Sequence, residues 1–364
     1  MSARPIDGQW TRKVYLDEAD GIRPWRDVLA QDQDDIKALA RRGLAQLRSG
    51  GGSPLPLWLI RTLSLLLYWW CVIAKRHYVQ ESNAIAKAVA VDRNIMTALQ
   101  RVYTLSHIGC TAAVFQHPDH GMVHVRCLDW EVMRPEIIQA TRLFDFQFGG
   151  KTVFVAAGIA GMVGVLSGIR PGKYSITINW AQSRGATIPW LKQDPTLLVR
   201  HVLETCDSYE EAVDRLANTE VGAPVYYIVC GAETGQGCVI EVAHLGLLRQ
   251  QVNVRHLDGE RPWLVQTNHY DENGALGWQN IAQPIPPRPN WEEEPLEVSS
   301  RERRRVMEAS VAGAVAQRSA TFPQLVESIR VSPVQNIHTV QQMVLHPQSG
   351  QVRVWAGVDP IGRR

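Results

Sequence analysis

Short segments in which apolar and polar residues alternate, separated by turn-forming residues, fill the middle of this chain and constrain its fold most strongly. The clearest pair covers 110–115 and 122–128 around a Pro-Asp-His-Gly turn at 118–121, and it predicts a β-hairpin. Further strands are expected at 13–18, 153–157, 174–178, 225–230, 238–243, 248–254 and 263–266, with a closing hairpin at 339–345 and 352–358. The middle of the chain is therefore expected to form β-sheet.

Helical signals lie between and around these strands. Asp194 followed by Pro195 is a cap with proline at the first helical position, and Ser208 with Glu211 forms a capping box. Other helices are expected at 27–48, 81–104, 301–316 and 322–331, whereas 271–298, with five prolines, is expected to be a loop. Because helices are interposed among the strands and appended to them, we expect an α+β fold with sheets covered by helices.

The most apolar stretch of the chain is 55–74, which carries Trp58, Trp69 and Trp70 and a single charge, Arg61. A helix needs about 20 predominantly apolar residues to span a bilayer. The stretch leaves three interpretations open: a buried helix, an interfacial helix that contacts lipid, or a membrane span. In the interfacial case the tryptophans would lie at the level of the lipid headgroups, so 55–74 is a candidate for peripheral membrane contact.

The composition argues against several kinds of partner. Lys and Arg number 38 against 36 Asp and Glu in 364 residues, and no long basic run contains aromatic residues, so nucleic acid is not expected. Residues 1–20 lack the apolar stretch of a secretory signal, so a cytoplasmic or peripheral membrane location is expected. The six cysteines are sparse and lack zinc-ligand spacing, so we expect a reducing compartment and no metal or other cofactor.

The first hairpin brings chemically useful side chains together. Its turn folds Cys110 back across from about Cys127, which places Arg126 and Asp129 beside the thiol. Since Arg126 and Asp129 are three residues apart, the strand must bend or bulge after Cys127 if both are to face Cys110. A cation stabilises a thiolate, and a nearby carboxylate can orient an amine or accept its proton. Without further evidence such a pattern is more often structural than catalytic.

Longer motifs begin at the same hairpin. Residues 108–114 read Ile-Gly-Cys-Thr-Ala-Ala-Val, and residues 126–130 read Arg-Cys-Leu-Asp-Trp. This pattern resembles the start of the catalytic subunit in the acid ceramidase and N-acylethanolamine acid amidase family, where Cys-Thr-Ser-Ile-Val precedes Arg-Asn-Met/Leu-Asp-Phe/Tyr at the same spacing. The resemblance continues through 161–172, 175–179, 208–212, 223–227 and 265–268, and it covers essentially everything after about Glu81. The N-terminal region resembles the family more loosely.

The resemblance implies an N-terminal-nucleophile hydrolase of the choloylglycine-hydrolase-like superfamily, with an αββα sandwich. It also implies self-cleavage between Gly109 and Cys110, into a mostly helical segment 1–109 and a catalytic domain 110–364 that stay associated. Cys110 would then become an N-terminus whose α-amino group acts as the general base. An α-amine has an ordinary pKa of about 7.7–8.0, low enough to take a proton from a thiol.

The same resemblance implies roles for three further side chains. Arg126 would hold the thiolate and shape the pocket, and Asp129 would form a hydrogen bond with the α-amine. The side-chain amide of Asn268 would donate to the oxyanion of the tetrahedral intermediate. From the residues alone, Asn268 is more simply a turn residue at a strand end.

One more arginine follows a short polar pair in the family. The corresponding residues here are Ser-Ser-Arg-Glu at 299–302, so Arg301 is expected in the site, with Arg304 as the second choice. Most charges of this cluster are expected to face solvent in the first turn of a helix. Trp130, Asn179 and Trp180 are the residues expected to contact substrate.

Three positions depart from the family pattern. Trp180 stands where acid ceramidase has Glu, and Cys127 replaces the usual Asn. Gly109 precedes the expected cut in place of a bulkier residue, and glycine would ease the strained turn that an N-to-S acyl shift needs. The cysteine positions offer no evident counterpart to the disulfide that links the subunits of the lysosomal relatives.

The activity implied by the resemblance is hydrolysis of the amide bond of an N-acyl lipid. Ceramide, which would give sphingosine and a fatty acid, is the first candidate, and N-acylethanolamine is the second. Bile-salt or penicillin-like amides belong to the same superfamily, but the strongest motif matches are to the lipid branch. The alternative from another class is a non-enzymatic, unprocessed lipid-binding or membrane-associated member of the fold, which Trp180 in place of Glu favours.

Overall fold

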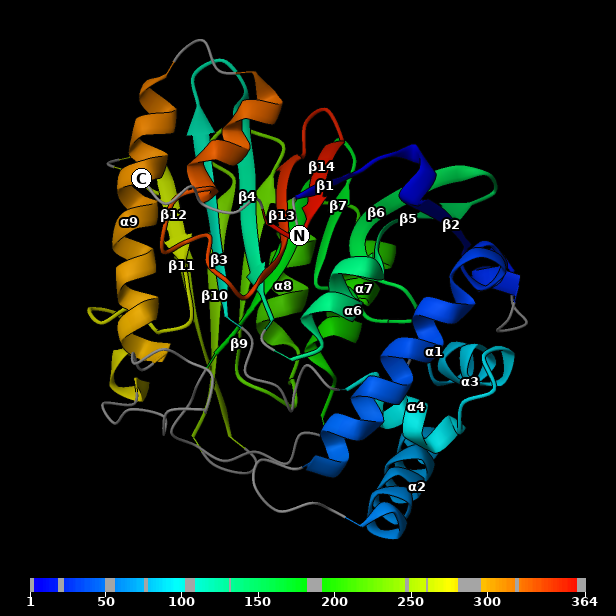
Figure 1. Ribbon diagram of the computed structural model, residues 1–364. Helices are drawn as coiled ribbons and strands as arrows, with labels where there is room; N and C mark the ends of the chain where they lie inside the picture. The colour runs from blue at the N-terminus through cyan, green and yellow to red at the C-terminus, as the bar shows by residue number, and fades with distance from the viewer. Residues whose placement is uncertain are drawn as a thin grey trace.

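The computed structural model describes residues 3–18, 23–49, 56–74, 78–101, 109–130, 132–181, 192–245, 249–259, 261–280, 296–317 and 321–358. Its centre is a pair of β-sheets that pack face to face through β3, β4, β8 and β9 (Figure 1). Helices α9 and η6 cover the outer face of one sheet, and α7 and α8 cover the outer face of the other. The predicted α+β class and the αββα sandwich are confirmed.

The first sheet, sheet A, carries the hairpin predicted around Cys110. All its neighbouring strands are antiparallel, and Cys110, the first residue of β3, lies opposite Leu128 of β4. The order of its strands is β1 (Arg4–Ile6), β14 (Gln351–Ala356), β13 (Thr339–His346), β4 (Gly121–Asp129), β3 (Cys110–His117) and β12 (Trp263–Gln266). Phe115, Val125, Met307 and Leu325 belong to the core between this sheet and its covering helices.

The second sheet, sheet B, is antiparallel except at one edge, where β2 pairs with β5 in parallel. Its order is β11 (Gln250–His256), β10 (Gly237–His244), β9 (Val225–Gly231), β8 (Tyr174–Trp180), β7 (Ser167–Arg170), β6 (Lys151–Ile159), β5 (Thr141–Phe148) and β2 (Thr11–Tyr15). Strands β1, β5 and β7 are not among the predicted ones, and position 248 of the predicted strand 248–254 lies outside the described residues.

The helices follow the predicted capping signals, with two corrections. They are α1 (Arg26–Ser49), α2 (Leu57–Ile73), α3 (Val79–Ala88), α4 (Arg93–Leu99), α6 (Arg134–Gln139), α7 (Pro195–Thr205), α8 (Tyr209–Asn218) and α9 (Leu296–Ala316), with 3-10 helices η1 (Gly8–Trp10), η2 (Arg23–Trp25), η5 (Gly277–Gln279) and η6 (Phe322–Ile329). Asp194 and Ser208 cap α7 and α8 as expected. The helix expected at 322–331 is a 3-10 helix.

The single helix expected at 81–104 is wrong. The chain divides there into α3 and α4, because Ala90 adopts a left-handed φ of 55° that an α-helix cannot continue through. Asp92 then begins a new helix by accepting hydrogen bonds from the backbone N–H groups of Asn94 and Ile95. Positions 102–104 of the prediction, and 281–295 of the predicted proline-rich loop, lie outside the described residues.

The segment before Cys110 is mostly helical, but it is also part of both sheets. Strand β1 forms one edge of sheet A and β2 one edge of sheet B. Buried Asp32 of α1 accepts hydrogen bonds from Arg12 of β2 at 2.8 Å and from Arg142 of β5 at 2.9 Å. Figure 1 shows helices α1 to α4 gathered at one end of the sandwich, away from α9.

Helix α2 is the predicted apolar segment, and the interpretation as a buried helix is wrong. Only one narrow side of it is buried, through Ile60, Ser64, Tyr68 and Cys71. Trp58, Leu66 and Ile73 are 68%, 62% and 73% exposed, and Trp69 is 50% exposed. Across the described parts of the chain, we find no helix with the length and apolar character that crossing a bilayer requires.

Candidate active site at the start of strand β3

Cys110 is the first residue of strand β3. Its side chain lies on the face of sheet A that packs against sheet B, and it is fully buried. Arg126 of β4 lies on the same face, with Nη2 3.4 Å from the Cys110 thiol. The guanidinium donates to the Leu166 carbonyl at 2.8 Å, and it also contacts Ser167 Oγ and the Ile178 carbonyl. These three partners are neutral, so they orient the guanidinium without neutralising its charge.

Two opposing effects act on the thiol. Burial raises the pKa of Cys110, because a thiolate loses its hydration inside the protein. The Arg126 guanidinium lowers the pKa through its charge and its hydrogen bond, but by less than burial raises it. In the intact chain the thiol is therefore neutral, with a cation placed where it would stabilise a thiolate.

Asn268, just beyond the end of β12, holds the nitrogen of the same cysteine. Its side-chain Oδ1 accepts from the Cys110 backbone N–H at 2.9 Å and from Arg303 Nη2 at 2.8 Å. Its Nδ2 donates to the Trp180 carbonyl at 2.8 Å. Asn268 thus lies beside Cys110, and the two ends of its amide contact different groups.

The arginine that the structure brings to Cys110 is Arg303, not the predicted Arg301 or Arg304. Arg303 is 1% exposed, and its Nη1 donates to the Cys110 carbonyl at 2.6 Å and to Thr111 Oγ1 at 2.8 Å. Arg301 forms an exposed ion pair with Glu272. Burial lowers the pKa of Arg303, while the nearby Asp129, Cys110 and Cys127 raise it.

Arg304 instead forms ion pairs with Glu308 and Asp271. The spacing of apolar residues in the sequence indicates that Arg303 is buried, although the family motif does not include this spacing. Positions 303, 307 and 311 are four apart and share one face of a helix. Met307 and Val311 are the apolar, fully buried members of that stripe, so helical periodicity would have placed Arg303 on the buried side.

Asp129 lies on the opposite face of β4 from Arg126, as strict alternation requires. The pairing of β4 with β13 does shift after Cys127, between Leu128 and Asp129, but the extra residue is Val340 of β13 and not a residue of β4. The Asp129 carboxylate accepts from Thr339 Oγ1 at 2.6 Å and from Asn336 Nδ2 at 2.9 Å. Burial raises its pKa, and the charge of Arg303 and these hydrogen bonds lower it.

The peptide group of Gly109 lies against Asp129. The Gly109 carbonyl accepts a hydrogen bond from the Asp129 backbone N–H at 2.8 Å. A Cβ atom at position 109 would lie 3.2 Å from the Asp129 Cβ and 3.3 Å from its Oδ2, so a larger residue would crowd this carboxylate. Arg126 thus faces the thiol, while Asp129 faces the peptide bond before it.

The three residues expected to contact substrate lie on two sides of Cys110. Asn179 and Trp180 end β8, where Asn179 Nδ2 donates to the Gln266 carbonyl at 2.9 Å and Trp180 bonds Asn268 through its carbonyl. Asn179 Oδ1 is buried and has no hydrogen-bond partner among the described residues. A buried acceptor of this kind costs free energy unless a donor reaches it.

Trp130 follows Asp129 and is 2% exposed. It lines a small apolar cavity of about 80 Å³ with residues of α1, α4 and the end of β6, among them Ile36, Leu39, Met96, Ile159 and Met162. The indole Nε1 of Trp130 is buried without a partner in the described part of the chain. Cys110 and Trp130 belong to the same cluster of buried core residues.

Comparisons with known proteins agree with the motifs and the fold. The family model described as acyl-coenzyme A:6-aminopenicillanic acid acyl-transferase matches residues 194–306, which include Asn268 and Arg303. Acid ceramidase of Heterocephalus glaber is 32% identical over 226 residues, which are 56% of this chain and 54% of that protein. Human acid ceramidase is 32% identical over 215 residues, 53% of each chain. The chain spans about half the length of these curated relatives.

Among solved structures, the Caenorhabditis elegans ortholog of N-acylethanolamine-hydrolyzing acid amidase superposes with a TM-score of 0.53 and 25% sequence identity. The match covers 68% of this chain and 100% of that chain. The ordered motifs from Cys110 to Asn268, the two-sheet sandwich and these likenesses agree with one another. In motifs and fold the chain is therefore similar to the acid ceramidase and N-acylethanolamine acid amidase family of N-terminal-nucleophile hydrolases.

Proposed function

We propose that this chain is a self-processing cysteine amidohydrolase that cleaves the amide bond of N-acyl lipids, with ceramide as the first candidate and N-acylethanolamine as the second. The observation that supports this best is the set of contacts that Cys110 makes. Its thiol faces Arg126, its nitrogen is bonded to Asn268, and its carbonyl is held by Arg303. The backbone groups of Cys110 are bonded here by buried polar side chains, Asn268 and Arg303.

The first step is self-cleavage. The Cys110 thiol attacks the Gly109 carbonyl carbon, the peptide C–N bond breaks, and the acyl group moves from nitrogen to sulfur. Water then hydrolyses this thioester, which leaves a carboxylate on Gly109 and a free thiol and α-amine on Cys110. The Asp129 backbone N–H, 2.8 Å from the Gly109 oxygen, is placed to stabilise the charge that develops on it.

Amide hydrolysis then uses the new terminus. The α-amine takes the thiol proton, and the thiolate beside Arg126 attacks the substrate carbonyl to form a tetrahedral oxyanion. The intermediate collapses to a thioester as the α-ammonium protonates the leaving amine, and water hydrolyses the thioester to the fatty acid. Asn268 Nδ2 is the proposed oxyanion donor. Asp129, which faces the Gly109 side, is proposed to bond the α-amine once that peptide is cut.

We further propose that the segments 1–109 and 110–364 stay together after the cut. The first segment supplies β1 to sheet A and β2 to sheet B, and its Arg12 and Asp32 form a buried network with Arg142 of the second segment. Removing it would leave buried charges without partners, which is costly in a protein interior.

Lipid substrates would reach the site from a membrane surface. A two-chain amide is too insoluble to arrive freely, and helix α2 exposes Trp58, Trp69 and Trp70 to solvent. Exposed tryptophans on an amphipathic helix bind the headgroup region of a bilayer. We therefore propose peripheral membrane contact through 55–74, and the apolar cavity beside Trp130 suits a substrate with a hydrocarbon chain.

The test is intact mass and N-terminal sequencing of the purified protein, followed by an assay on a panel of N-acyl lipids. We expect pieces of 109 and 364 − 109 = 255 residues, with the longer one starting at Cys110, while Cys110→Ala stays as one chain. An intact wild-type chain that hydrolyses amides would overturn the mechanism. An intact, inactive chain that binds lipid would instead establish the non-enzymatic alternative.

A further inference from the structure

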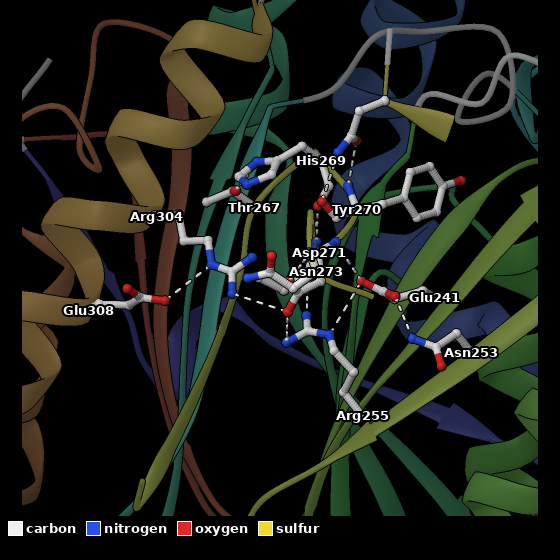
Figure 2. A network of polar contacts seen from close by, with 12 residues as sticks. Glu241, Asn253, Arg255, Thr267, His269, Tyr270, Asp271, Asn273, Arg304 and Glu308 are labelled. Atoms are coloured by element: carbon white, nitrogen blue, oxygen red, sulfur yellow. Dashed lines mark hydrogen bonds and ion pairs between the residues drawn. The ribbon is translucent and has the colours of Figure 1, made fainter. Parts of the chain in front are cut away.

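The peptide after strand β12 carries Asn268, and it is attached to helix α9 by a fully buried serine, Ser300. The Ser300 hydroxyl accepts a hydrogen bond from the Asn268 backbone N–H at 2.8 Å and donates to Thr267 Oγ1 at 2.9 Å. It also lies 2.8 Å from Nδ1 of His269, which Figure 2 shows beside Thr267. One hydroxyl therefore contacts three consecutive residues at the end of this strand.

Ser300 shares a face of α9 with Arg303, because residues three apart on a helix lie on the same side. Arg303 Nη2 donates to Asn268 Oδ1 at 2.8 Å, and Arg303 Nη1 donates to the Cys110 carbonyl. Asn268 is thus held twice from one helical face, by its backbone at Ser300 and by its side chain at Arg303. A shift at Ser300 would move the asparagine and the arginine relative to each other.

A second set of contacts holds the same peptide three residues further on. Asp271 lies 3.5 Å from Arg255 of β11 and 3.5 Å from Arg304 of α9. Arg255 also pairs with buried Glu241 of β10, and Arg304 with Glu308. Figure 2 shows Arg304 between Glu308 and Asp271, and Arg255 between Asp271 and Glu241. These ion pairs fix residue 271, whereas Ser300 bonds the backbone of residue 268 directly.

We propose that Ser300 is a positioning residue of the active site, whose hydroxyl sets where Asn268 and Arg303 lie relative to Cys110. The proposal rests on the amidohydrolase function proposed above. In the described structure Ser300 contacts Thr267, Asn268 and His269 rather than the thiol, so it acts through its neighbours. A displacement of about 1 Å in groups that orient a reaction can cost about 100-fold in rate.

His269 is neutral in this arrangement. Burial lowers the pKa of His269 to about 3, and the charges of the neighbouring arginines lower it as well. The Ser300 proton goes to Thr267 Oγ1, and one lone pair of the Ser300 oxygen accepts from the Asn268 backbone N–H. A neutral ring with its proton on Nδ1 can donate to the second lone pair.

The experiment compares wild type, Ser300→Ala, Ser300→Thr and a matched control, Ser328→Ala. Ser328 is also buried, and its hydroxyl donates to the Leu325 carbonyl at 2.7 Å within η6. The control therefore removes a buried serine hydroxyl without touching Asn268. For each variant we would measure self-cleavage, kcat and KM on a short-chain soluble N-acyl amide, and Tm.

We expect Ser300→Ala to lower kcat by about 10- to 100-fold with little change in KM, Ser300→Thr to recover most of the loss, and Ser328→Ala to keep wild-type kcat. An unchanged kcat in Ser300→Ala, or an equal loss of kcat in both alanine variants, would overturn the proposal.

If Ser300→Ala does not fold, Thr267→Val takes its place: a lower kcat at unchanged Tm supports the proposal, and an unchanged kcat overturns it. A wild type that neither cuts itself nor hydrolyses amides would refute the proposed function instead.

Discussion

The site around Cys110 and helix α2 depart from the usual distribution of side chains in opposite ways. At the site, charged groups such as Arg126, Arg303 and Asp129 are buried. On α2, large apolar side chains such as Trp58 and Leu66 are exposed. A buried charge destabilises the fold unless it has hydrogen-bond or ion-pair partners, and an exposed apolar patch is unfavourable unless another surface covers it. In the first region the buried charges have hydrogen-bond partners within the protein, whereas for the second we propose a membrane surface as the partner.

The largest expected effect tests whether the buried charges are functional. Arg303→Ala should stop self-cleavage and lower turnover by at least about 100-fold, because Asn268 and the Cys110 carbonyl lose their donor. It should also destabilise the protein by about 3–5 kcal/mol, since Asp129 loses a nearby buried cation. Arg301→Ala is the matched control: its ion pair with Glu272 is exposed, and such pairs contribute about 0–1 kcal/mol. Kinetics and urea unfolding of both variants provide the check, and equal effects would contradict our placement of Arg303.

The next effect distinguishes the role of Asn268 Oδ1 as an acceptor from the proposed role of Nδ2 as the oxyanion donor. In processed enzyme, Asn268→Ala should lower kcat by about 100- to 1000-fold through loss of the oxyanion donor. Asn268→Asp keeps an acceptor for the Cys110 nitrogen and Arg303 but has no NH₂ group. We therefore expect the Asp variant to cut itself yet to turn over amides as slowly as the Ala variant. Wild-type turnover in the Asp variant would move the oxyanion role to another group.

A smaller and more selective effect is expected on α2. Replacing Trp69 and Trp70 with Ser should weaken liposome binding and hydrolysis of vesicle-borne lipid, and leave hydrolysis of a short-chain soluble amide nearly unchanged. Trp278→Ser is the control, because Trp278 is 53% exposed but lies in η5. Equal losses on both substrates together with a lower Tm would mean that the α2 tryptophans act only in packing.

The last effect is on stability and not on activity, and it concerns the polar interior between the sheets. His124 is buried there between Ser175 Oγ and Thr177 Oγ1, each at 2.9 Å, and burial lowers its pKa to about 3. The unfolded chain takes up this proton at about pH 6.5 and the folded chain does not. Stability from this group is therefore complete above about pH 6.5 and falls towards pH 3, by up to about 1.4 kcal/mol per pH unit.

Urea unfolding at pH 7 and pH 5 would measure this fall. His124→Gln should show a shallower loss between the two values than wild type, because it removes the titrating group. The same slope in both proteins would show that other groups dominate the acid response.

Local patterns predict the parts of the molecule that depend on neighbouring residues. The hairpin of β3 and β4, the caps at Asp194 and Ser208 and the final hairpin follow from alternation and from helix-start signals. The break at Ala90 does not, because a left-handed alanine is set by its tertiary surroundings. The parallel pairing of β2 with β5 joins segments about 130 residues apart, and no local pattern specifies it.

The candidate site shows the same limit. Cys110, Arg126 and Asn268 come from motifs whose order survives in this chain, and the structure brings them together. The motif match predicts Arg301, two positions before Arg303, which contacts Cys110 in the structure. Helical periodicity favours Arg303, because Met307 and Val311 mark the buried face of the helix. Ser300 had no motif to reveal it, since its role depends on a helix and a strand end that meet only in the folded chain.

The place of β1 and β2 at the sheet edges has a consequence for assembly. If the chain is cut before Cys110, what was one polymer becomes two, and contacts that form within a molecule at high effective concentration become contacts between molecules. Processed protein that is denatured and diluted would have to recover both edge strands by collision, so its refolding would be second order in protein. The uncut precursor would refold at a rate independent of concentration. Losing the N-terminal piece would also expose the edges of β14 and β5, which are templates for aggregation.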